Sequence, residues 1–384
     1  MTRPGRGRGR AARVVALLLA AIVVAGCSGT AKPKPTPLEP VTPQIGGRLV
    51  WTQRIESVKF PLQVAVNETA SSGGVFTVAA TDGTVVAIQA DSGSELWRAS
   101  VGTPLSAGVG SDGRFAAVVT RDNELVTLEA GRVLWRARLG ARVATPPLVA
   151  GERVFVMSVD RAVQAFDALD GRKLWAVARP GEPLTLAKAG VLAAYRDTLL
   201  VGQGPRLVGV DPTRGSLRWE VAIGTPRGTN EVERLADLLA PSTRAGNVVC
   251  ARAFQNAVGC VNAERGTIIW TRNVGGNEGI GGDGTLIVGA DGTDRITAWR
   301  SDNGDVVWIT DKLLYRDLSA PLLVGRTAVF GDVEGQVHLL SREDGKILLR
   351  LGTDGSPVAS APVVSGKTML VVTRNGGLFA FRPE

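Results

Sequence analysis

Side chains that could perform acid–base or metal chemistry are scarce in this sequence. Its 384 residues include one histidine, His338, and three cysteines, Cys27, Cys250 and Cys260. General acid–base catalysis needs a titratable group beside a positioned partner, and a zinc site needs several Cys or His ligands. His338 lies in the segment GQVHLL, where a lone histidine is typical of a satisfied, half-buried residue. The sequence therefore predicts no catalytic residue, no metal ligand and no cofactor.

Nucleophile and phosphate motifs are not found in a suitable context either. No Gly-x-Ser-x-Gly elbow or phosphate-binding loop stands between an expected strand and an expected helix. The many Asp–Gly turns, such as ALDGRKLW, lack the dense series of acidic positions that a calcium loop uses. We interpret them as turns.

Cys250 and Cys260 flank the expected hairpin CARAFQNAVGC. A two-residue turn at Gln255–Asn256 would place Cys250 opposite Val261 and point Cys260 to the other face. A turn centred on Gln255 alone would make the two cysteines direct partners. An oxidising compartment permits a disulfide, which in either case would be structural, and both alternatives stay open from sequence.

The third cysteine ends a segment that is typical of a secretory signal peptide. Five arginines precede Val14–Ala25, a run of 12 apolar residues, and Gly26–Cys27 follows. A membrane-spanning helix needs about 20 apolar residues, so this run is too short to span. We predict a signal peptide over 1–26. Its removal lowers the formal net charge from +8 to +3, which argues against nucleic-acid binding.

The junction Val24-Ala25-Gly26-Cys27 resembles the lipobox of bacterial lipoproteins. That resemblance implies acyl chains, palmitate among them, on Cys27 and a stable membrane anchor. Ser28 stands where lipoproteins kept in the inner membrane typically carry Asp, so the outer membrane is favoured. Five prolines between Thr30 and Gln44 then predict an extended spacer, and we assign 27–46 to a lipidated tether.

One recurring sequence motif, Gly-x-x-x-Trp, indicates the expected fold. It recurs at intervals of about 40 residues, with an eighth copy, Gly345–Leu349, that lacks the indole. The seven complete copies are Gly47–Trp51, Gly93–Trp97, Gly131–Trp135, Gly171–Trp175, Gly215–Trp219, Gly266–Trp270 and Gly304–Trp308. Each unit reads as four short antiparallel strands, which is the pattern of a β-propeller blade.

The two ends of the repeat region complete each other. Ser360–Phe381 supplies three strands, and Gly47–Trp51 supplies a fourth strand without the three before it. Pairing them closes the ring and removes two exposed strand edges. The sequence therefore predicts an all-β domain over 47–384, an eight-bladed propeller of four-stranded antiparallel blades.

The repeat unit AFDALDGRKLW (Ala165–Trp175) resembles the repeat of pyrroloquinoline-quinone (PQQ) propellers. That resemblance supports the eight-bladed fold and raises the alternative of a PQQ-dependent dehydrogenase or ligand-binding periplasmic propeller. Such enzymes are usually much longer and carry adjacent cysteines, whereas Cys250 and Cys260 are ten residues apart. A third alternative, an intracellular WD40-type scaffold, is excluded by the signal peptide.

Three segments resemble the BamB family, the propeller lipoproteins of the outer-membrane β-barrel assembly (BAM) complex. They stand in that family's order: TNEVERLAD (Thr229–Asp237), LLYRDLSAPLLV (Leu313–Val324) and GDVEGQVHLL (Gly331–Leu340). The resemblance implies a non-enzymatic scaffold on the periplasmic face of the outer membrane. It also implies binding to the periplasmic POTRA domains of BamA, the barrel protein of the complex, in support of outer-membrane protein insertion.

The resemblance also implies which residues touch BamA. Asp237 matches an acidic contact, and Leu184 and Leu186 in EPLTLAKAG match two apolar contacts one blade earlier. Arg234 and Arg316 are expected as loop-shaping or accessory contacts. The alternative is that the polar insert around Asn230–Asp237 is only a solvated loop without a binding role.

Two departures from the family pattern bear on this site. Leu239 stands where the family often has a second Asp, and Ala187 stands where it often has Arg. We therefore expect a more apolar contact with weaker salt dependence. Nascent outer-membrane proteins are a second expected partner, through strand addition at blade edges.

Overall fold

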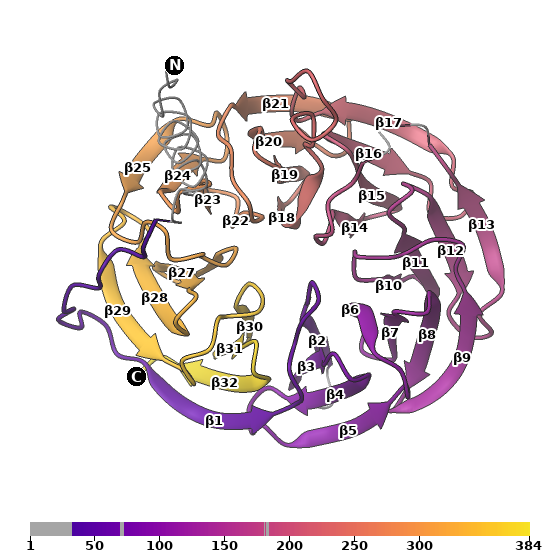
Figure 1. The fold of residues 1–384 in the computed structure, drawn as a ribbon, viewed down its shortest axis with the longest axis horizontal. Helices are drawn as coiled ribbons and strands as arrows, with labels where there is room; N and C mark the ends of the chain where they lie inside the picture. Colours follow the sequence, from indigo (N-terminus) through magenta and orange to yellow (C-terminus); the bar gives the residue numbers. More distant parts are fainter. Residues whose placement is uncertain (1–32, 70–72, 180, 182–183) are drawn as a thin grey trace, which may run out of the picture. The chain divides into compact units, whose positions relative to one another are not determined.

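The computed structural model describes residues 33–69, 73–179, 181 and 184–384. The predicted signal peptide and Cys27 lie outside these residues. The repeat region belongs to the compact unit Thr36–Glu384. In this unit, eight four-stranded antiparallel sheets form the blades of a β-propeller, as predicted (Figure 1).

Within each blade, the four strands follow one another from the centre of the ring outward. Blade 1 contains β2 (Ala65–Thr69), β3 (Gly73–Ala79), β4 (Thr84–Gln89) and β5 (Glu95–Ser100), and blade 2 contains β6 (Leu105–Ser111), β7 (Phe115–Thr120), β8 (Glu124–Glu129) and β9 (Arg132–Arg138). Blade 3 contains β10 (Leu148–Ala150), β11 (Arg153–Met157), β12 (Val163–Asp167) and β13 (Lys173–Val177). Blade 4 contains β14 (Leu192–Tyr195), β15 (Thr198–Gln203), β16 (Arg206–Val210) and β17 (Leu217–Ala222). Blade 5 contains β18 (Leu238–Ala245), β19 (Val248–Ala253), β20 (Ala257–Asn262) and β21 (Thr267–Arg272), and blade 6 contains β22 (Gly281–Gly282), β23 (Leu286–Ala290), β24 (Ile296–Arg300) and β25 (Val306–Thr310). Blade 7 contains β26 (Leu322–Val324), β27 (Thr327–Gly331), β28 (Gln336–Ser341) and β29 (Ile347–Gly352). Blade 8 contains β30 (Val363–Ser365), β31 (Thr368–Val372), β32 (Gly377–Arg382) and β1 (Arg48–Arg54).

Burial explains the composition of the strands. The second strand of a blade is covered on both faces, so β7 (FAAVVT) is apolar throughout most of its length and buried at every position. The outermost strand has one face toward solvent, so β5 (ELWRAS) alternates between exposed and half-buried residues. The buried apolar clusters join neighbouring blades; one, for example, combines Phe115 of blade 2 with Val154 of blade 3. The core is therefore a series of seams between blades.

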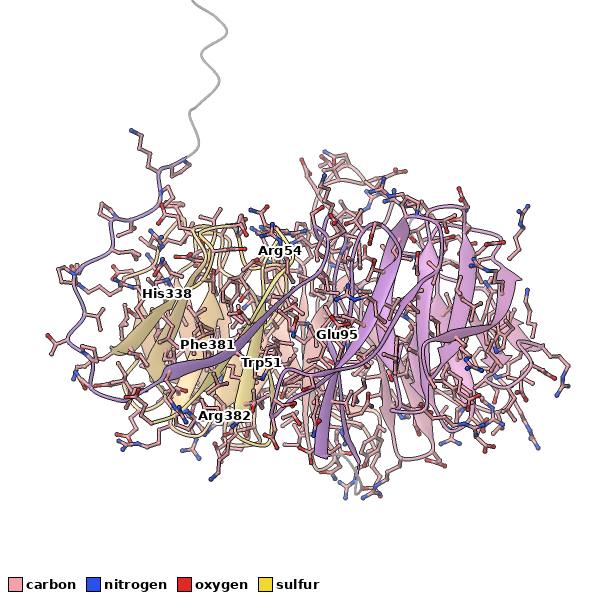
Figure 2. The ribbon with its side chains drawn as sticks, turned by 90° about the horizontal axis from the view of Figure 1, so that it is seen from below. Trp51, Arg54, Glu95, His338, Phe381 and Arg382 are labelled. Atoms are coloured by element: carbon pink, nitrogen blue, oxygen red, sulfur yellow. A yellow bond between two sulfur atoms is a disulfide. The ribbon has the colours of Figure 1, made fainter. Side chains whose placement is uncertain are left out.

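The ring closes as the sequence predicted. β1 pairs antiparallel with β32, with Thr52 opposite Phe379 and Arg54 opposite Gly377. Figure 2 shows the labelled residues of this pair, with Arg54 near one face of the propeller and Arg382 near the other. Blade 8 thus combines both ends of the repeat region, and β1 is its outer strand.

The glycine and tryptophan of the Gly-x-x-x-Trp motif form contacts between neighbouring blades. The motif glycines from Gly93 to Gly345 have φ between +64° and +78°, a conformation that favours glycine. A Cβ on Gly304 would also lie 2.5 Å from the Trp270 ring of the preceding blade. The Trp270 indole Nε1 donates to Ser301 O at 2.8 Å across the same seam. Leu349 takes the place of the indole beside Gly47.

Part of the predicted tether lies against the propeller. Thr36 N donates to Leu314 O at 3.0 Å, and Gln44 N donates to Leu348 O at 2.9 Å. Leu38 packs on the core cluster shared by blades 6 and 7. We call Thr36–Gln44 the strap.

Candidate partner-binding face

Antiparallel strand order sorts the connections of the ring onto two faces. The loops that join one blade to the next lie on the same face as the turns between the second and third strands of each blade. We call this the loop face. The turns between first and second strands, and between third and fourth strands, lie on the opposite face. The polar insert before Asp237 and the segment Leu184–Lys188 are both inter-blade loops, so both belong to the loop face.

The insert is ordered by its own side chains. The Glu233 backbone N–H donates to the Asn230 side-chain oxygen at 3.0 Å, and the Glu233 carboxylate accepts from the Thr229 N–H at 2.8 Å. This reciprocal arrangement resembles the capping box of a helix N-terminus. The Thr229 hydrogen bonds lower the pKa of Glu233. The resulting turn exposes Val232, whose exposed fraction of 68% is the highest among the large apolar residues that the structure describes.

Asp237 ties the insert to the neighbouring loop. One carboxylate oxygen accepts from Arg161 Nη1 at 3.1 Å, and the other accepts from the Leu186 backbone N–H at 2.8 Å. Arg161 also donates to Leu184 O at 3.3 Å. The Asp237 side chain is only 17% exposed. Its carboxylate therefore holds the Leu184–Leu186 loop in place.

Leu184 and Leu186 are presented differently. Leu184 is 37% exposed, whereas Leu186 is half-buried and lines a small pocket together with Met157 and Asp237. Lys188 forms an ion pair with Glu278 of the loop between blades 5 and 6, which extends the connected surface toward blade 6. The loop face thus brings Leu184, Leu186 and Asp237 together.

Ala187 and Leu239, the two residues that depart from the family pattern, differ in their burial. Ala187 is exposed beside Leu186, so the missing arginine removes a surface charge from the loop. Leu239 is 2% exposed and pairs with Arg252 inside blade 5. Leu239 therefore belongs to the core of the propeller.

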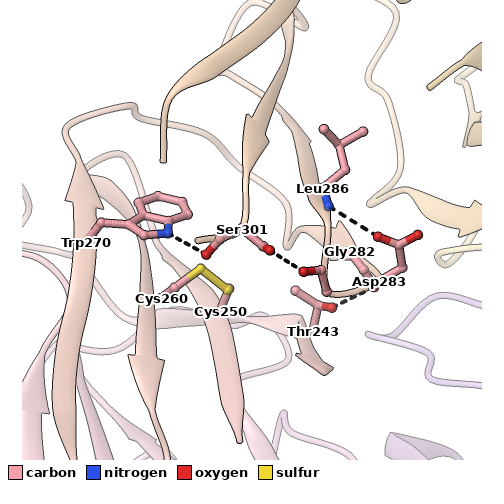
Figure 3. The surroundings of a disulfide bond; sticks show 9 residues. Thr243, Cys250, Cys260, Trp270, Gly282, Asp283, Leu286 and Ser301 are labelled. Atoms are coloured by element: carbon pink, nitrogen blue, oxygen red, sulfur yellow. Dashed lines mark hydrogen bonds between the residues drawn. A yellow bond between two sulfur atoms is a disulfide. The ribbon is translucent and has the colours of Figure 1, made fainter. Parts of the chain in front are cut away.

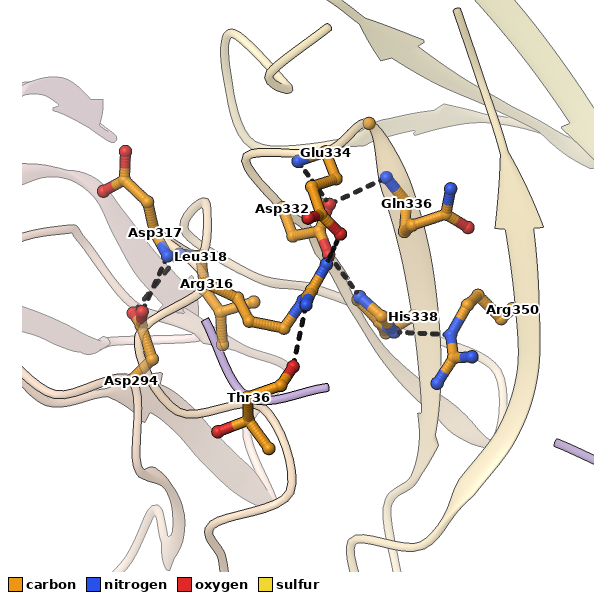
Figure 4. Close-up of polar contacts among 12 residues, drawn as sticks. Thr36, Asp294, Arg316, Asp317, Leu318, Asp332, Glu334, Gln336, His338 and Arg350 are labelled. Atoms are coloured by element: carbon orange, nitrogen blue, oxygen red, sulfur yellow. Dashed lines mark hydrogen bonds and ion pairs between the residues drawn. The ribbon is translucent and has the colours of Figure 1, made fainter. Parts of the chain in front are cut away.

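Arg234 and Arg316 lie in different surroundings. Arg234 is half-exposed in the insert, and its backbone N–H donates to Asn230 O at 3.2 Å. Arg316 is only 2% exposed, and its Nε donates to the Asp332 carboxylate at 2.7 Å (Figure 4). Arg316 also pairs with Glu334. It therefore shapes the loop of blade 7, and its guanidinium is not available as a surface contact.

His338 completes the same buried cluster. Its Nε2 lies 2.9 Å from the Asp332 carboxylate, and Arg350 Nε donates to its Nδ1 at 3.3 Å (Figure 4). Burial lowers the pKa of His338, against the opposing effect of its hydrogen bond with Asp332. Burial would raise the pKa of Asp332, but hydrogen bonds from His338, Gln336 N–H and Arg316 hold it below the usual value. A neutral histidine fixed on both ring nitrogens has a structural role.

The hairpin cysteines form a disulfide. Cys250 lies opposite Cys260 in the β19–β20 pair, and Gln255 occupies the centre of the turn with φ of +49°. The structure therefore has the turn centred on Gln255. The bond is buried beside Trp270, at the seam between blades 5 and 6 (Figure 3).

The centre of the ring contains a cavity of about 640 Å³, lined by inter-blade loops and first strands of several blades. Its charged lining includes Lys59, Arg244, Asp317 and the Lys188–Glu278 pair. Among the residues that the structure describes, no group of three or more His, Cys, Asp or Glu side chains is placed to hold a metal ion.

Comparison with known proteins gives the same family from two directions. A family model described as outer membrane protein assembly factor BamB matches residues 44–100, 81–310 and 317–384. A protein of that name from Burkholderia pseudomallei is 37% identical over 380 residues, covering 98% of this chain and 99% of the relative. The chain belongs to the BamB family. The family member from Escherichia coli is 25% identical over 311 residues, covering 78% of this chain and 79% of its own length.

Solved structures agree on the fold. The crystal structure of BamB from Moraxella catarrhalis superposes with a TM-score of 0.77 at 21% identity, covering 88% of this chain and 99% of that one. The quinohemoprotein alcohol dehydrogenase from Comamonas testosteroni superposes with a TM-score of 0.65 at 14% identity, covering 89% of this chain and 78% of that one. The likeness to the dehydrogenase is one of fold and transfers no activity.

Proposed function

We propose that this BamB-family chain is a non-enzymatic scaffold for outer-membrane protein assembly, anchored by lipid on Cys27 and facing the periplasm. The observation that carries the proposal is the loop face of blades 4 and 5. There, Asp237 and Arg161 hold the Leu184–Leu186 loop beside the insert, with Leu184 and Val232 exposed. Ordered loops with exposed apolar side chains on a rigid scaffold are typical of binding sites.

The partner that we assign to this surface is the periplasmic POTRA region of BamA. Membership in the BamB family supports this assignment, because its relatives are named outer membrane protein assembly factors. Leu184 and Val232 would supply the apolar contact. Arg234 and the Lys188–Glu278 pair would lie at its polar rim.

The test is calorimetric titration of soluble Ser28–Glu384 with the periplasmic fragment of the same organism's BamA. Leu184→Glu places a charge on the proposed contact, and we expect at least a tenfold loss of affinity, about 1.4 kcal/mol. Leu169→Glu is the matched control, since Leu169 is 50% exposed in a turn on the opposite face. No binding by the folded wild type, or equal losses in the two variants, would contradict the proposal.

Strand addition of nascent outer-membrane proteins is a second candidate function. The outer strand β25 reads VVWIT, without a charged residue, and Val306, Val307 and Ile309 are 53%, 45% and 56% exposed. Native edge strands usually carry charges that prevent such pairing. Val307→Lys should reduce capture of an unfolded barrel protein while BamA binding persists. Unchanged capture would count against this candidate.

A further inference from the structure

The strap is attached to the propeller along its length. It begins at Thr36, whose N–H donates to Leu314 O on the loop face, and ends at Gln44, whose N–H donates to Leu348 O on β29. Between these points, Leu38 packs on the core cluster of blades 6 and 7. The strap therefore runs down the side of the ring, and β1 then returns toward the loop face (Figure 2).

Two arginines bind the strap through its backbone. Arg316 Nη1 donates to Thr36 O at 2.9 Å, and Arg350 Nη1 donates to Glu39 O at 3.0 Å. Hydrogen bonds from charged donors to backbone carbonyls are stronger than neutral ones. The Lys312–Glu39 pair adds little, because the two side chains are 58% and 75% exposed.

Both arginines are oriented by the buried cluster rather than by the strap. Arg316 is fixed by Asp332 and Glu334, and Arg350 is fixed on His338. Asp294 accepts the backbone N–H groups of Asp317 and Leu318 at 2.7 and 3.2 Å, which orders the loop that carries Arg316 (Figure 4). The strap therefore meets donors that are already in place.

The strap determines the point at which the N-terminal chain leaves the propeller. With the strap docked, the chain leaves the propeller at Thr36, on the loop face. Without it, the chain would leave at Arg48, which pairs with Arg382 near the opposite face. Nine residues separate Cys27 from Thr36 and 21 separate it from Arg48, so the chain can reach at most about 32 Å from Thr36 and about 76 Å from Arg48.

We propose that the strap, clamped by Arg316 and Arg350, fixes the exit of the lipid-anchored N-terminus on the loop face, so that this face is turned toward the bilayer. The inference rests on the proposed lipidation of Cys27. It assigns a role to the cluster of Arg316, Asp332, His338 and the half-buried Arg350, which the proposed partner contact does not use. The partner surface at Leu184 and the bilayer then lie on the same side of the propeller.

Energy transfer from a labelled protein to acceptor lipids tests the orientation. The full lipidated chain is placed in phosphatidylethanolamine–phosphatidylglycerol vesicles, with a single label at Glu231→Cys on the loop face or at Leu169→Cys on the opposite face. Acylation of Cys27 and the Cys250–Cys260 disulfide leave the introduced thiol as the labelling site. We expect at least twofold greater transfer from position 231. Equal transfer, or greater transfer from position 169, would overturn the inference.

The double variant Leu38→Asp/Arg350→Gln tests whether the strap is the cause. It should speed hydrogen exchange at the Thr36 and Gln44 amides and reduce the difference between the two labels. A label difference that persists after those amides are freed would overturn the role of the strap, as would amides that exchange at the wild-type rate. A chain without an acyl group on Cys27 by mass spectrometry would refute the lipid anchor itself, and this inference with it.

Discussion

Replacing Asp237 with alanine separates a positioning role from a contact role. In the structure, this carboxylate accepts from Arg161 Nη1 and from the Leu186 N–H, and it is largely shielded from solvent. Alanine removes the acceptor of the Leu186 N–H and the anion beside Arg161. The loop that presents Leu184 should therefore lose its fixed conformation while the blades stay intact.

The magnitude follows from the two lost interactions. Hydrogen bonds to charged groups contribute about 1.5–3 kcal/mol each, and the 17% exposure of Asp237 reduces that value. We expect the loop to lose about 2–3 kcal/mol of local stability. Since about 1.4 kcal/mol corresponds to a factor of ten, opening of the loop should become about 30- to 150-fold more frequent.

Hydrogen exchange at the Leu186 amide measures this opening, and titration with the BamA periplasmic fragment measures its effect on binding. Both should change in Asp237→Ala, with affinity falling at least tenfold. Asp237→Asn keeps an acceptor for the Leu186 N–H and should show a smaller change in each. Asp122→Ala, which removes an exposed carboxylate from a turn on the same face, should show neither. An affinity loss with unchanged Leu186 protection would refute positioning and indicate direct contact.

Three further predictions concern the scaffold. Burial keeps the pKa of His338 below its usual value of about 6.5, so His338 costs no free energy of unfolding above that pH. As the pH falls through 6.5, the free energy of unfolding declines by at most about 1.4 kcal/mol per pH unit, because the unfolded chain binds the proton more readily. Urea unfolding at pH 7.5 and 5.5 should show this loss in the wild type and less of it in His338→Gln, and equal losses would contradict it. Cys250→Ser/Cys260→Ser opens a crosslink with a sequence separation of 10 residues and should cost about 2–3 kcal/mol, seen as a lower urea midpoint. Trp270→Ala empties a seam position that is 6% exposed and should cost about 3–5 kcal/mol, whereas a loss below about 1 kcal/mol would refute the seam role of the indole.

The fold was predictable because its signal is periodic. Each blade repeats a glycine that tolerates positive φ and an indole that fills the next seam, so the blade count and the ring closure follow from spacing. The position of one residue in a turn was not predictable. Placing Gln255 at the centre of its turn decides whether Cys250 faces Cys260, and the turn composition is compatible with either arrangement.

The site was only partly predictable, because its decisive contacts join distant segments. Asp237 meets Arg161 from 76 residues away, and no local pattern indicates that its carboxylate is used within the chain. Arg316 was expected to shape a loop, but its burial with Asp332 and its contact with Thr36 depend on three separate segments. The docked strap was missed because an extended proline-rich segment has no internal hydrogen bonds that would indicate where it binds.

Photo-crosslinking in cells tests the central claim most directly. A photoreactive amino acid at position 184 or 232 lies on the exposed part of the loop face, and one at position 169 lies on the opposite face. The scaffold role predicts that the first two positions capture BamA through its periplasmic domains and that position 169 does not. Capture from position 169 alone, or no BamA adduct from position 184 or 232 in cells that contain the complex, would contradict that role.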